Sequence, residues 1–380
     1  MMLSEQHKDI KNMCEKFSDS EVAPLAEKID KEAMIPAELY TKMAANGFFG
    51  IFIPEEYGGA GMDYTSYSIM VEEVSRGCAS CGVLLSAHNS LAVWPILKFG
   101  SEEQKSKWLP KMASGDGIGC YCLSEPNVGS DPGAMITFVE DKGDHYELNG
   151  SKNFITNGRE AKVAVVFAKT RKTDNYKGIS AFIVDMEADG VAVQKVEEKL
   201  GIKGSSTAQI VFEKVKLPKD SLLGENEKGF KVAMMTLDGG RIGIASQALG
   251  IAEAAYRVAI KYSTERMAFG KPISGLQAIQ FKIADMATKI LASRLLIQHA
   301  SELKDKDLPY SKEAAQCKLF ASEAAMWVAN QGVQTLGGNG YIKEYPAERH
   351  FRDAKITEIY EGTSEIQRIV IAGNELKAYR

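Results

Sequence analysis

The sequence lacks any block of like charges, and its overall charge is nearly balanced. It has 46 Lys and Arg residues against 50 Asp and Glu residues, so the formal net charge is −4. A protein whose main partner is nucleic acid or an anionic membrane usually presents a basic surface, so this composition argues against both partners. With 45% hydrophobic and 25% charged residues, the composition is that of an ordinary globular protein. A chain of 380 residues is long enough for roughly two or three domains.

The sequence also lacks a secretory signal and a membrane-spanning run. Its first ten residues are polar and of mixed charge, unlike the apolar region of a signal peptide or the Arg-rich start of a transit peptide. The most continuous apolar stretch, Gly82 to Leu97, is too short to span a bilayer and is interrupted by Asn89 and Pro95. We therefore expect a buried core helix there, no membrane insertion and a cytoplasmic protein.

Signatures of metal sites and of common catalytic motifs are scarce. Cys78 and Cys81 have half the spacing of a zinc site, but no second such pair follows, and the five histidines are scattered. The glycines between Gly115 and Gly119 precede a predicted strand instead of joining a strand to a helix, so the dinucleotide fingerprint fails. P-loop, nucleophile-elbow and zinc-helix motifs are absent. We expect no metal, and we interpret the cysteines as small buried residues.

The sequence does contain a helix–sheet–helix order. Apolar residues recur at helical spacing over residues 1–118, where Ser101 and Gln104 form a capping box. Over residues 119–229, short β-branched and aromatic runs alternate with turns, which predicts an antiparallel sandwich or barrel. Helical periodicity returns over residues 230–380. The predicted fold is α+β and multidomain, with an N-terminal helical domain, a middle antiparallel β-barrel or sandwich domain and a C-terminal four-helix bundle.

Four polar, Gly-rich clusters interrupt these elements, and each has two interpretations. Tyr121–Asp131 offers backbone N–H groups to a heterocycle or a phosphate, or it is a plain loop. Phe154–Gly158 offers an aromatic face and a hydroxyl, or it ends a hairpin at an Asn-Gly turn. Arg266–Gly270 suits a pyrophosphate and a ring, or it is a capped helix end. Gln334–Glu365 contains Glu361, which could instead be a solvated carboxylate near a helix N-terminus.

Taken together, the clusters resemble the acyl-CoA dehydrogenase family, in the same order and with similar spacing over essentially the whole chain. The first signature is Cys122-Leu123-Ser124-Glu125-Pro126, followed by Gly129-Ser130-Asp131. The second is Gln334, Gly337-Gly338, Gly340-Tyr341, Glu344, Arg349 and Asp353. The third is Tyr360-Glu361-Gly362-Thr363-Ser364. Their joint occurrence is far more specific than any one of them.

The resemblance implies an FAD cofactor and Glu361 as the catalytic base that removes the α-proton of an acyl-CoA while the β-hydrogen moves as hydride to flavin N5. The residues that it places on FAD are Tyr121, Leu123, Ser124, Ser130, Phe154, Ile155, Thr156, Arg266, Phe269, Gln277, Gln334, Gly337, Gly338, Thr363 and Glu365. Those from Arg266 to Gly338 would hold the pyrophosphate and adenosine across a subunit boundary. The residues that it places on the substrate are Ser130, Asp238, Arg241, Tyr360 and Gly362.

The same resemblance implies an electron-transfer flavoprotein as acceptor and a homotetramer built as a dimer of dimers. Some relatives carry the base as a Glu where this sequence has Gly240, and glutaryl-CoA relatives carry an Arg near Ser86–Leu91, where none is found. The segment from Leu85 to Pro95 is most similar to butyryl-CoA dehydrogenases, which predicts a short acyl group.

Three alternatives stay open at this point. His88 and Asn89 either line the substrate pocket, which would suit a branched, cyclic or otherwise unusual acyl group, or satisfy polar groups inside the helices. An acyl-CoA oxidase would use the same residues and pass electrons to oxygen. A catalytically silent acyl-CoA-binding protein would keep the fold without the chemistry.

Overall fold

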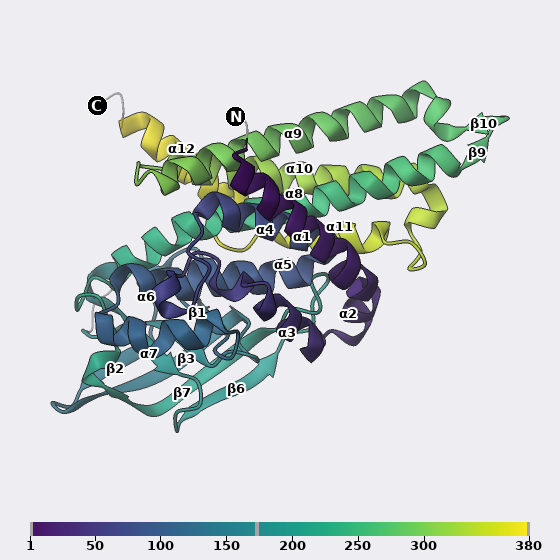
Figure 1. Ribbon diagram of the computed structural model, residues 1–380. Coiled ribbons are helices and arrows are strands. Elements are labelled where there is room, and N and C mark those ends of the chain that lie inside the picture. Colours follow the sequence, from purple (N-terminus) through teal and green to yellow (C-terminus); the bar gives the residue numbers. More distant parts are fainter. Residues whose placement is uncertain (1–2, 172–174, 378–380) are drawn as a thin grey trace.

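The computed structural model describes residues 3–171 and 175–377, and its elements follow the predicted helix–sheet–helix order (Figure 1). The N-terminal helices are α1 (Glu5–Phe17), α2 (Ala26–Glu32), α3 (Ala37–Ala45), α4 (Tyr64–Gly77), α5 (Ala79–Ser86), α6 (Trp94–Phe99) and α7 (Glu102–Ala113). A π-helical turn, η5 (Ala87–Val93), joins α5 to α6. The predicted capping box at Ser101 and Gln104 opens α7 and is confirmed.

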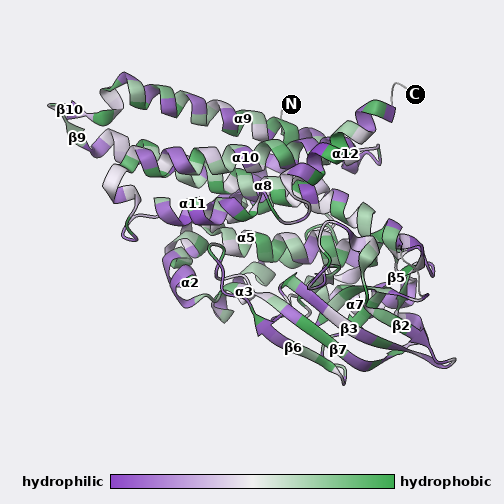
Figure 2. Ribbon diagram, turned by 180° about the vertical axis from the view of Figure 1, so that it is seen from behind, coloured by the Kyte–Doolittle hydropathy of each residue, from purple (hydrophilic) through white to green (hydrophobic). Residues whose placement is uncertain are grey.

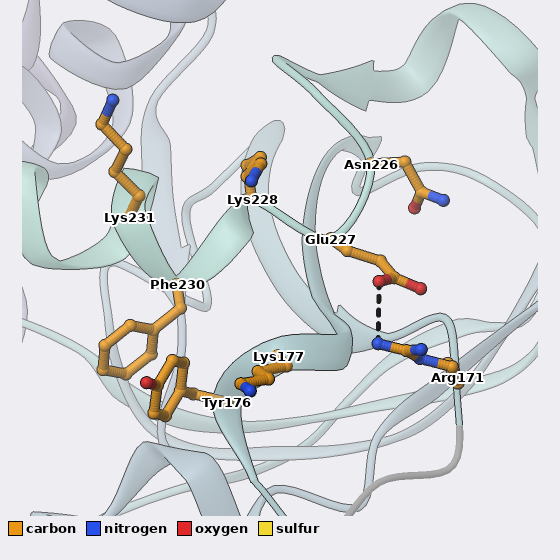
Figure 3. A pocket seen from close by; sticks show the side chains of 8 residues that line it. All are labelled: Arg171, Tyr176, Lys177, Asn226, Glu227, Lys228, Phe230 and Lys231. Carbon is orange, nitrogen blue, oxygen red and sulfur yellow. Dashed lines mark hydrogen bonds and ion pairs between the residues drawn. The ribbon is translucent and has the colours of Figure 1, made fainter.

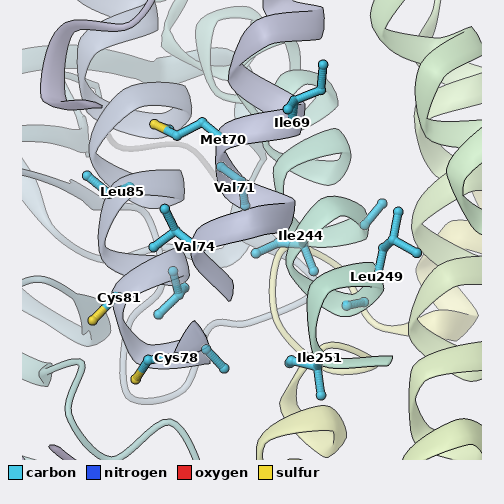
Figure 4. Close-up of a cluster of buried hydrophobic side chains, with 14 of the residues drawn as sticks. Ile69, Met70, Val71, Val74, Cys78, Cys81, Leu85, Ile244, Leu249 and Ile251 are labelled. Atoms are coloured by element: carbon cyan, nitrogen blue, oxygen red, sulfur yellow. The ribbon is translucent and has the colours of Figure 1, made fainter. Parts of the chain in front are cut away.

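The apolar stretch noted in the sequence is a helix of the core. By length and composition alone, Ala79–Phe99 could cross a membrane, but 89% of its most apolar part is buried inside the fold. In Figure 2, hydrophobic residues colour most of α5. Helices α4 and α5 pack against α8 (Gly229–Glu265), and Figure 4 draws apolar side chains of one buried cluster from all three helices, among them Val74, Leu85 and Ile244. This core supports the segment of α8 that carries the site.

His88 and Asn89 make buried hydrogen bonds within the helical layer and to the first strand, as the second of their two interpretations expects, although Asn89 Oδ1 has no partner among the described residues. Both are fully buried, and Asn89 donates to the carbonyl oxygen of Phe48 at 2.8 Å. The backbone N–H of Gly119 donates to Nδ1 of His88 at 2.9 Å, so Nε2 carries the proton and donates to the carbonyl oxygen of Phe49 at 2.9 Å. In its neutral form, the imidazole of His88 therefore links the helical layer to the first strand through two hydrogen bonds.

Acid should weaken this tie. Burial lowers the pKa of His88 from 6.5 to about 4, so the unfolded chain binds more protons between these values and stability is lost as the pH falls through them. Between pH 7 and pH 4.5 the loss should be about 2 kcal/mol, because a difference of one pKa unit corresponds to about 1.4 kcal/mol and most of the interval from 6.5 to 4 is crossed. Urea denaturation at pH 7 and pH 4.5 measures the effect, and His88→Gln should lose less stability on acidification than the wild type. Equal losses would contradict the assignment.

The middle strands form one open sheet. They are β1 (Gly119–Cys122), β2 (Phe138–Asp141), β3 (His145–Thr156), β4 (Val163–Lys169), β5 (Ile179–Asp185), β6 (Val191–Val196), β7 (Thr207–Pro218) and β8 (Leu222–Leu223). Their order is β6-β7-β3-β2-β4-β5-β8, with β1 also on β4. The sheet does not close into a barrel, so of the two predicted forms the sandwich-like one holds. Most strand pairs are antiparallel as predicted, but the β1–β4 and β2–β4 pairs are parallel.

The parallel pairs have a geometric cause that bears on the site. Cys122 ends the pairing of β1 at Val166, and Phe138 begins that of β2 at Lys169, so the two strands lie end to end along one edge of β4. The chain between them, residues 123–137, leaves the sheet. This interruption places the first polar cluster as a loop at the edge of the sheet that faces the helices.

The C-terminal elements are α8, the hairpin β9 (Met267–Ala268) and β10 (Lys271–Pro272), α9 (Gln277–Asp305), α10 (Ser311–Leu336), α11 (Ala347–Ile356) and α12 (Ser364–Lys377). Helices α8, α9 and α10 pack side by side, and α11 and α12 pack on α10 to complete the predicted bundle. Figure 1 shows α8 running from the sheet to the far tip of the bundle, where the small hairpin projects.

Candidate active site

Glu361 lies in a strained turn between α11 and α12. Its φ of 53° and the φ of 94° at Gly362 are both in the left-handed region, which is costly for a residue with a side chain. Two buried side chains hold the turn. Lys318 Nζ donates to the carbonyl oxygen of Gly362 at 2.8 Å, and Gln367 Nε2 donates to the same oxygen at 2.8 Å. Strain that is fixed from two helices is typical of a functional position.

The carboxylate of Glu361 points at α8. A Cβ on Gly240 would lie well inside contact distance of Glu361 Oε2 and 2.8 Å from Leu91 Cδ2. Only a residue without a side chain leaves room for the carboxylate at this point of the helix. Oε2 is buried and has no hydrogen-bond partner among the residues that the structure describes. A buried carboxylate oxygen without a partner is costly unless a ligand or reaction uses it.

Burial decides the protonation of this carboxyl group. It raises the pKa of Glu361 from 4.5 to about 8, although Lys318 and then Arg241 act in the opposite direction. A carboxylate with a pKa near the working pH can take up a proton during a reaction and release it afterwards. Four tyrosines surround the group, and burial raises the pKa of each one, so all four stay protonated: Tyr64, Tyr67, Tyr121 and Tyr360.

Asp238 and Arg241 lie one turn apart on α8, beside Glu361. Arg241 Nη1 donates to Asp238, which also accepts a hydrogen bond of 3.0 Å from Ser311 Oγ. Arg241 Nε and the hydroxyl of Tyr64 are buried, and neither has a hydrogen-bond partner within the described ranges. Together with Glu361 Oε2, these atoms give one wall of the site three polar groups that a bound polar molecule could satisfy.

The two segments expected to flank a flavin ring lie next to each other. The backbone N–H of Asn153 donates to the carbonyl oxygen of Ser124 at 2.9 Å. Phe154 has a φ of 57° and is 63% exposed, because a bulge in β3 turns it out of the sheet. Tyr121, on β1, donates through its hydroxyl to the carbonyl oxygen of Ala233 on α8 at 3.2 Å. An exposed ring at a forced backbone angle suits contact with a planar ligand.

The other residues predicted to bind FAD near Glu361 have either a buried side chain, so that only their backbone could contact a ligand, or an exposed polar side chain. The side chains of Leu123 and Ile155 point into the cores on either side of the sheet. Ser130 is exposed on the loop of residues 123–137. Thr363 and Glu365 lie at the start of α12, next to Glu361. The Asn-Gly turn after β3 exists, but it leads to β4, which does not pair with β3, so the hairpin interpretation is wrong.

A buried ion pair fixes the loop behind the proposed ring site. Lys152 and Glu125 are both buried, and Lys152 Nζ lies 2.8 Å from Glu125 Oε1 and 3.1 Å from the carbonyl oxygen of Leu123. Glu125 also accepts hydrogen bonds from the backbone N–H groups of Ile136 and Thr137. The pair thus connects both ends of the loop to β3.

The remaining predicted cofactor residues lie elsewhere. Arg266, Phe269, Gln277, Gln334, Gly337 and Gly338 are all exposed at the far end of the bundle. Phe269, at the turn of the β9–β10 hairpin, is 90% exposed. Arg266 follows Gly240 by 26 residues of α8, which at 1.5 Å per residue is about 39 Å. One chain therefore does not bring this group to Glu361.

The sequence analysis missed a polar cavity at the start of α8 (Figure 3). Its volume is about 490 Å³, and it is lined by Arg171, Tyr176, Lys177, Asn226, Glu227, Lys228, Phe230 and Lys231. The rings of Tyr176 and Phe230 lie 4.7 Å apart, and Arg171 pairs with Glu227 at 3.0 Å. Four cationic groups against one carboxylate favour an anionic ligand. Lys228 and Lys231, one helical turn apart, were the only sequence signal for it.

No group of three His, Cys, Asp or Glu side chains in the described residues lies together as metal ligands would. All six cysteines are buried free thiols.

Comparison with known proteins gives a consistent match over the chain. Three family profiles match residues 4–116, 120–215 and 227–376, and they describe the N-terminal, middle and C-terminal domains of acyl-CoA dehydrogenases. A curated relative is the mitochondrial short-chain specific acyl-CoA dehydrogenase of Homo sapiens, which is 55% identical over 378 residues, 100% of this chain and 92% of the relative.

Solved structures agree with the sequence matches. Butyryl-CoA dehydrogenase from Megasphaera elsdenii has a TM-score of 0.97 and 44% identity, with 99% of each chain covered. A chain from a structure of the electron transferring flavoprotein of Acidaminococcus fermentans, solved to study flavin-based electron bifurcation, has a TM-score of 0.97 and 50% identity, with 99% of each chain covered. A glutaryl-CoA dehydrogenase from Mycobacterium smegmatis, solved with FADH2, has a TM-score of 0.92 and 33% identity over 97% of this chain and 94% of its own.

Proposed function

Because this chain belongs to the acyl-CoA dehydrogenase family, and is thus an FAD-dependent enzyme that dehydrogenates an acyl-CoA thioester, we propose that its acyl group is short and that Glu361 is its catalytic base. The observation that carries the assignment of the base is the buried, unpartnered carboxylate of Glu361 against Gly240. A base has to reach its proton without competing hydrogen bonds, and this oxygen has none within the described ranges.

The proposed chemistry divides between the protein and its cofactor. When bound, FAD would supply the acceptor for the β-hydrogen of the acyl group, which leaves as hydride. Glu361 removes the α-proton, and its backbone N–H donates to the thioester carbonyl oxygen, on which negative charge develops. Phe154 and the backbone of Leu123 and Ser124 are the groups of this chain that would hold the flavin ring. The surrounding tyrosine rings exclude water, which keeps the carboxylate weakly solvated and basic.

Polar contacts beyond Glu361 support a short acyl group. Tyr360 donates through its hydroxyl to Gln247, and the hydroxyls of Tyr67 and Ser86 lie 3.0 Å apart. Gln247 follows Gly240 by seven residues on α8, about 10 Å along the helix. A long acyl chain that ran along this face would have to displace these hydrogen-bonded side chains. A short chain would end before them.

The cationic cavity at the start of α8 suits the nucleotide end of CoA. Lys231 and Asp238 are seven residues apart and lie on one face of the helix, with Arg241 next to them. From Phe230 to Gly240 the helix rises about 15 Å, a distance that an extended pantetheine arm can cover. The phosphates would meet the cations, and the adenine ring would meet Tyr176 and Phe230.

Replacing two of these cations should weaken binding of the nucleotide. The double variant Lys177→Ala/Lys231→Ala should raise KM for butyryl-CoA by roughly tenfold, the equivalent of about 1.4 kcal/mol, because charge attraction is lost at a solvated site. KM for butyryl-pantetheine, which has no nucleotide, should stay constant. Steady-state kinetics with both thioesters provides the comparison. Lys261→Ala, an exposed change on the same helix, is the control. An equal effect on both thioesters would contradict this location.

A homotetramer would explain why the residues predicted to bind FAD lie in two separate groups, one near Glu361 and one around Arg266. About 39 Å of helix, longer than extended FAD, lies between Gly240 and Arg266. The exposed cluster at the tip of the bundle would therefore serve the flavin of a neighbouring subunit. Exposed apolar side chains on the outer helices, among them Leu291, Leu295 and Ile369, fit contact with other subunits.

The proposed function is tested by the flavin's colour. Anaerobic mixing with butyryl-CoA should bleach the bound flavin within the reaction time of an enzyme, and straight acyl-CoAs should bleach it more slowly as their length increases. Faster bleaching by a long, branched or cyclic acyl-CoA would overturn the short-chain proposal. No bleaching by any acyl-CoA would indicate the catalytically silent alternative.

An electron-transfer flavoprotein is the proposed electron acceptor. The match to a structure of that description supports it. In the same experiment, adding such a flavoprotein should restore the oxidised colour much faster than air does. Rapid reoxidation by air with formation of peroxide would indicate an oxidase instead.

A further inference from the structure

Lys318 occupies an unusual position for a charged residue. It lies on the buried face of α10 among small residues such as Ala314 and Cys317, and its relative exposure is 0%. Its ammonium makes one hydrogen bond, to the carbonyl oxygen of Gly362, and within the described ranges no carboxylate is hydrogen-bonded to it. A buried ammonium without a hydrogen-bonded carboxylate destabilises a fold, so its presence calls for a specific role.

The surroundings of Lys318 contain one carboxylate on which it can act from a buried position. Burial lowers the pKa of Lys318 to about 8, and Glu361 is the first of the groups that act against this shift. Glu358 and Glu365 contribute in the same direction but lie nearer to solvent, and Arg241 opposes them. The ammonium is therefore charged at neutral pH and faces Glu361 across the strained turn.

Lys318 differs from Arg241, the other cation that faces Glu361. Arg241 is hydrogen-bonded to Asp238, so much of its charge is already compensated. Lys318 has no such partner, and it is the stronger of the two in lowering the pKa of Glu361. The remaining titratable groups around the carboxylate are neutral tyrosines. Lys318 is thus the main uncompensated positive charge at this carboxylate.

We propose that Lys318 is a positioning residue for Glu361: its ammonium holds the Glu361–Gly362 turn by the Gly362 carbonyl oxygen and supplies a buried positive charge that favours the ionised form of the Glu361 carboxylate over the protonated one. This inference rests on Glu361 being the catalytic base. Lys318 then has two separable effects. It holds the turn, an effect that it shares with Gln367, and it contributes a positive charge near Glu361, which Gln367 does not.

The two effects are separated by the pH profile of flavin reduction. Lys318→Met, which has similar volume and no charge, should move the midpoint of the profile to higher pH and slow reduction by butyryl-CoA about tenfold at pH 6.5, with most of the rate recovered above the new midpoint. Gln367→Met removes the neutral donor to the same oxygen, so it should lower the rate equally at every pH. Lys312→Met, a half-exposed lysine of the same helix, should change neither.

A second measurement needs no turnover. The pKa of Glu361 in the folded protein is about 8, above its ordinary value of 4.5, so the wild type loses stability relative to Glu361→Gln as the pH rises through this range. In a Lys318→Met background, that loss should continue to a higher pH. Denaturation of the holoenzyme across pH measures it.

The outcomes distinguish this inference from the proposed function. If Lys318→Met lowers the rate by the same factor at every pH, as Gln367→Met should, the electrostatic role is wrong. If its rate and midpoint equal those of the wild type, both roles are wrong. If Glu361→Gln reduces its flavin at the normal rate, the proposed base itself is wrong, whatever Lys318 does.

Discussion

Glu361→Gln should keep its yellow flavin and reduce it with butyryl-CoA roughly 10⁴-fold more slowly than the wild type, the upper end of what a general base contributes. The amide has the shape of the carboxylate but cannot accept the α-proton. The turn that carries it should persist, because Lys318 and Gln367 hold backbone oxygens and not the side chain of Glu361. Stopped-flow absorbance of the flavin after anaerobic mixing measures the rate.

Two controls make this result specific. Glu375→Gln, an exposed carboxylate on α12, should reduce its flavin at the normal rate. The visible spectrum of Glu361→Gln before mixing reports whether FAD is bound as in the wild type. Bleaching by Glu361→Gln within tenfold of the wild-type rate would remove Glu361 from the chemistry.

The pH dependence of the wild type follows from the same group. Since burial raises the pKa of Glu361 to about 8, the ionised base is the minor form at neutral pH. The rate of reduction should therefore rise with pH up to this value and level off above it. The raised pKa also gives the proton a place to stay once it has left the substrate.

Local sequence patterns predicted much of the fold, and the resemblance to the family pointed to Glu361 as the proposed base. Helical periodicity and the Ser101 capping box are local features, and the helix–sheet–helix order follows from them. The family signatures placed Glu361 and the flavin segments in one region, and the contact between Asn153 and Ser124 brings two of those segments together. Each of these predictions depends on residues close in sequence or on a motif with fixed spacing.

What the sequence did not predict depends on contacts between distant segments. The end-to-end arrangement of β1 and β2 on β4 is set by register, which no local pattern encodes. The cationic cavity forms only where the loop before β5 meets the start of α8. In the sequence, Lys318 resembles any other charged residue of an amphipathic helix, and only the packing of α10 shows that it is buried. The distance between the two FAD clusters follows from the length of α8.

Gly240→Ala should lower the rate of flavin reduction by about 100-fold, because it displaces the base without altering it. The new methyl group would lie 2.8 Å from Leu91 Cδ2 and closer still to Glu361 Oε2. Helix α8 is buried on all sides here, so the side chain of Glu361 has to move. A misplacement of about 1 Å at a reacting group is enough to cost roughly 10²-fold. Stopped-flow reduction by butyryl-CoA again provides the rate.

Stability and activity should separate in this variant. An Ala is a better helix residue than a Gly, so any loss of stability in Gly240→Ala reports the clash alone. Gly373→Ala, on α12 with open space around its Cβ, is the matched control and should leave the rate of reduction unchanged. A wild-type rate in Gly240→Ala would show that the carboxylate does not have to lie against α8.

Shortening the base offers a stricter test of the geometry. Glu361→Asp withdraws the carboxylate by one methylene, so alone it should slow reduction by leaving the base short of the α-carbon. In the double variant Gly240→Ala/Glu361→Asp, the methyl group of Ala would fill space that the shorter side chain has vacated. The losses in rate caused by the two single substitutions should therefore not add. Strictly additive losses would mean that residues 240 and 361 act independently. In that case, the close approach of the Glu361 carboxylate to Gly240 would not determine how far this carboxylate extends toward the α-carbon of the substrate.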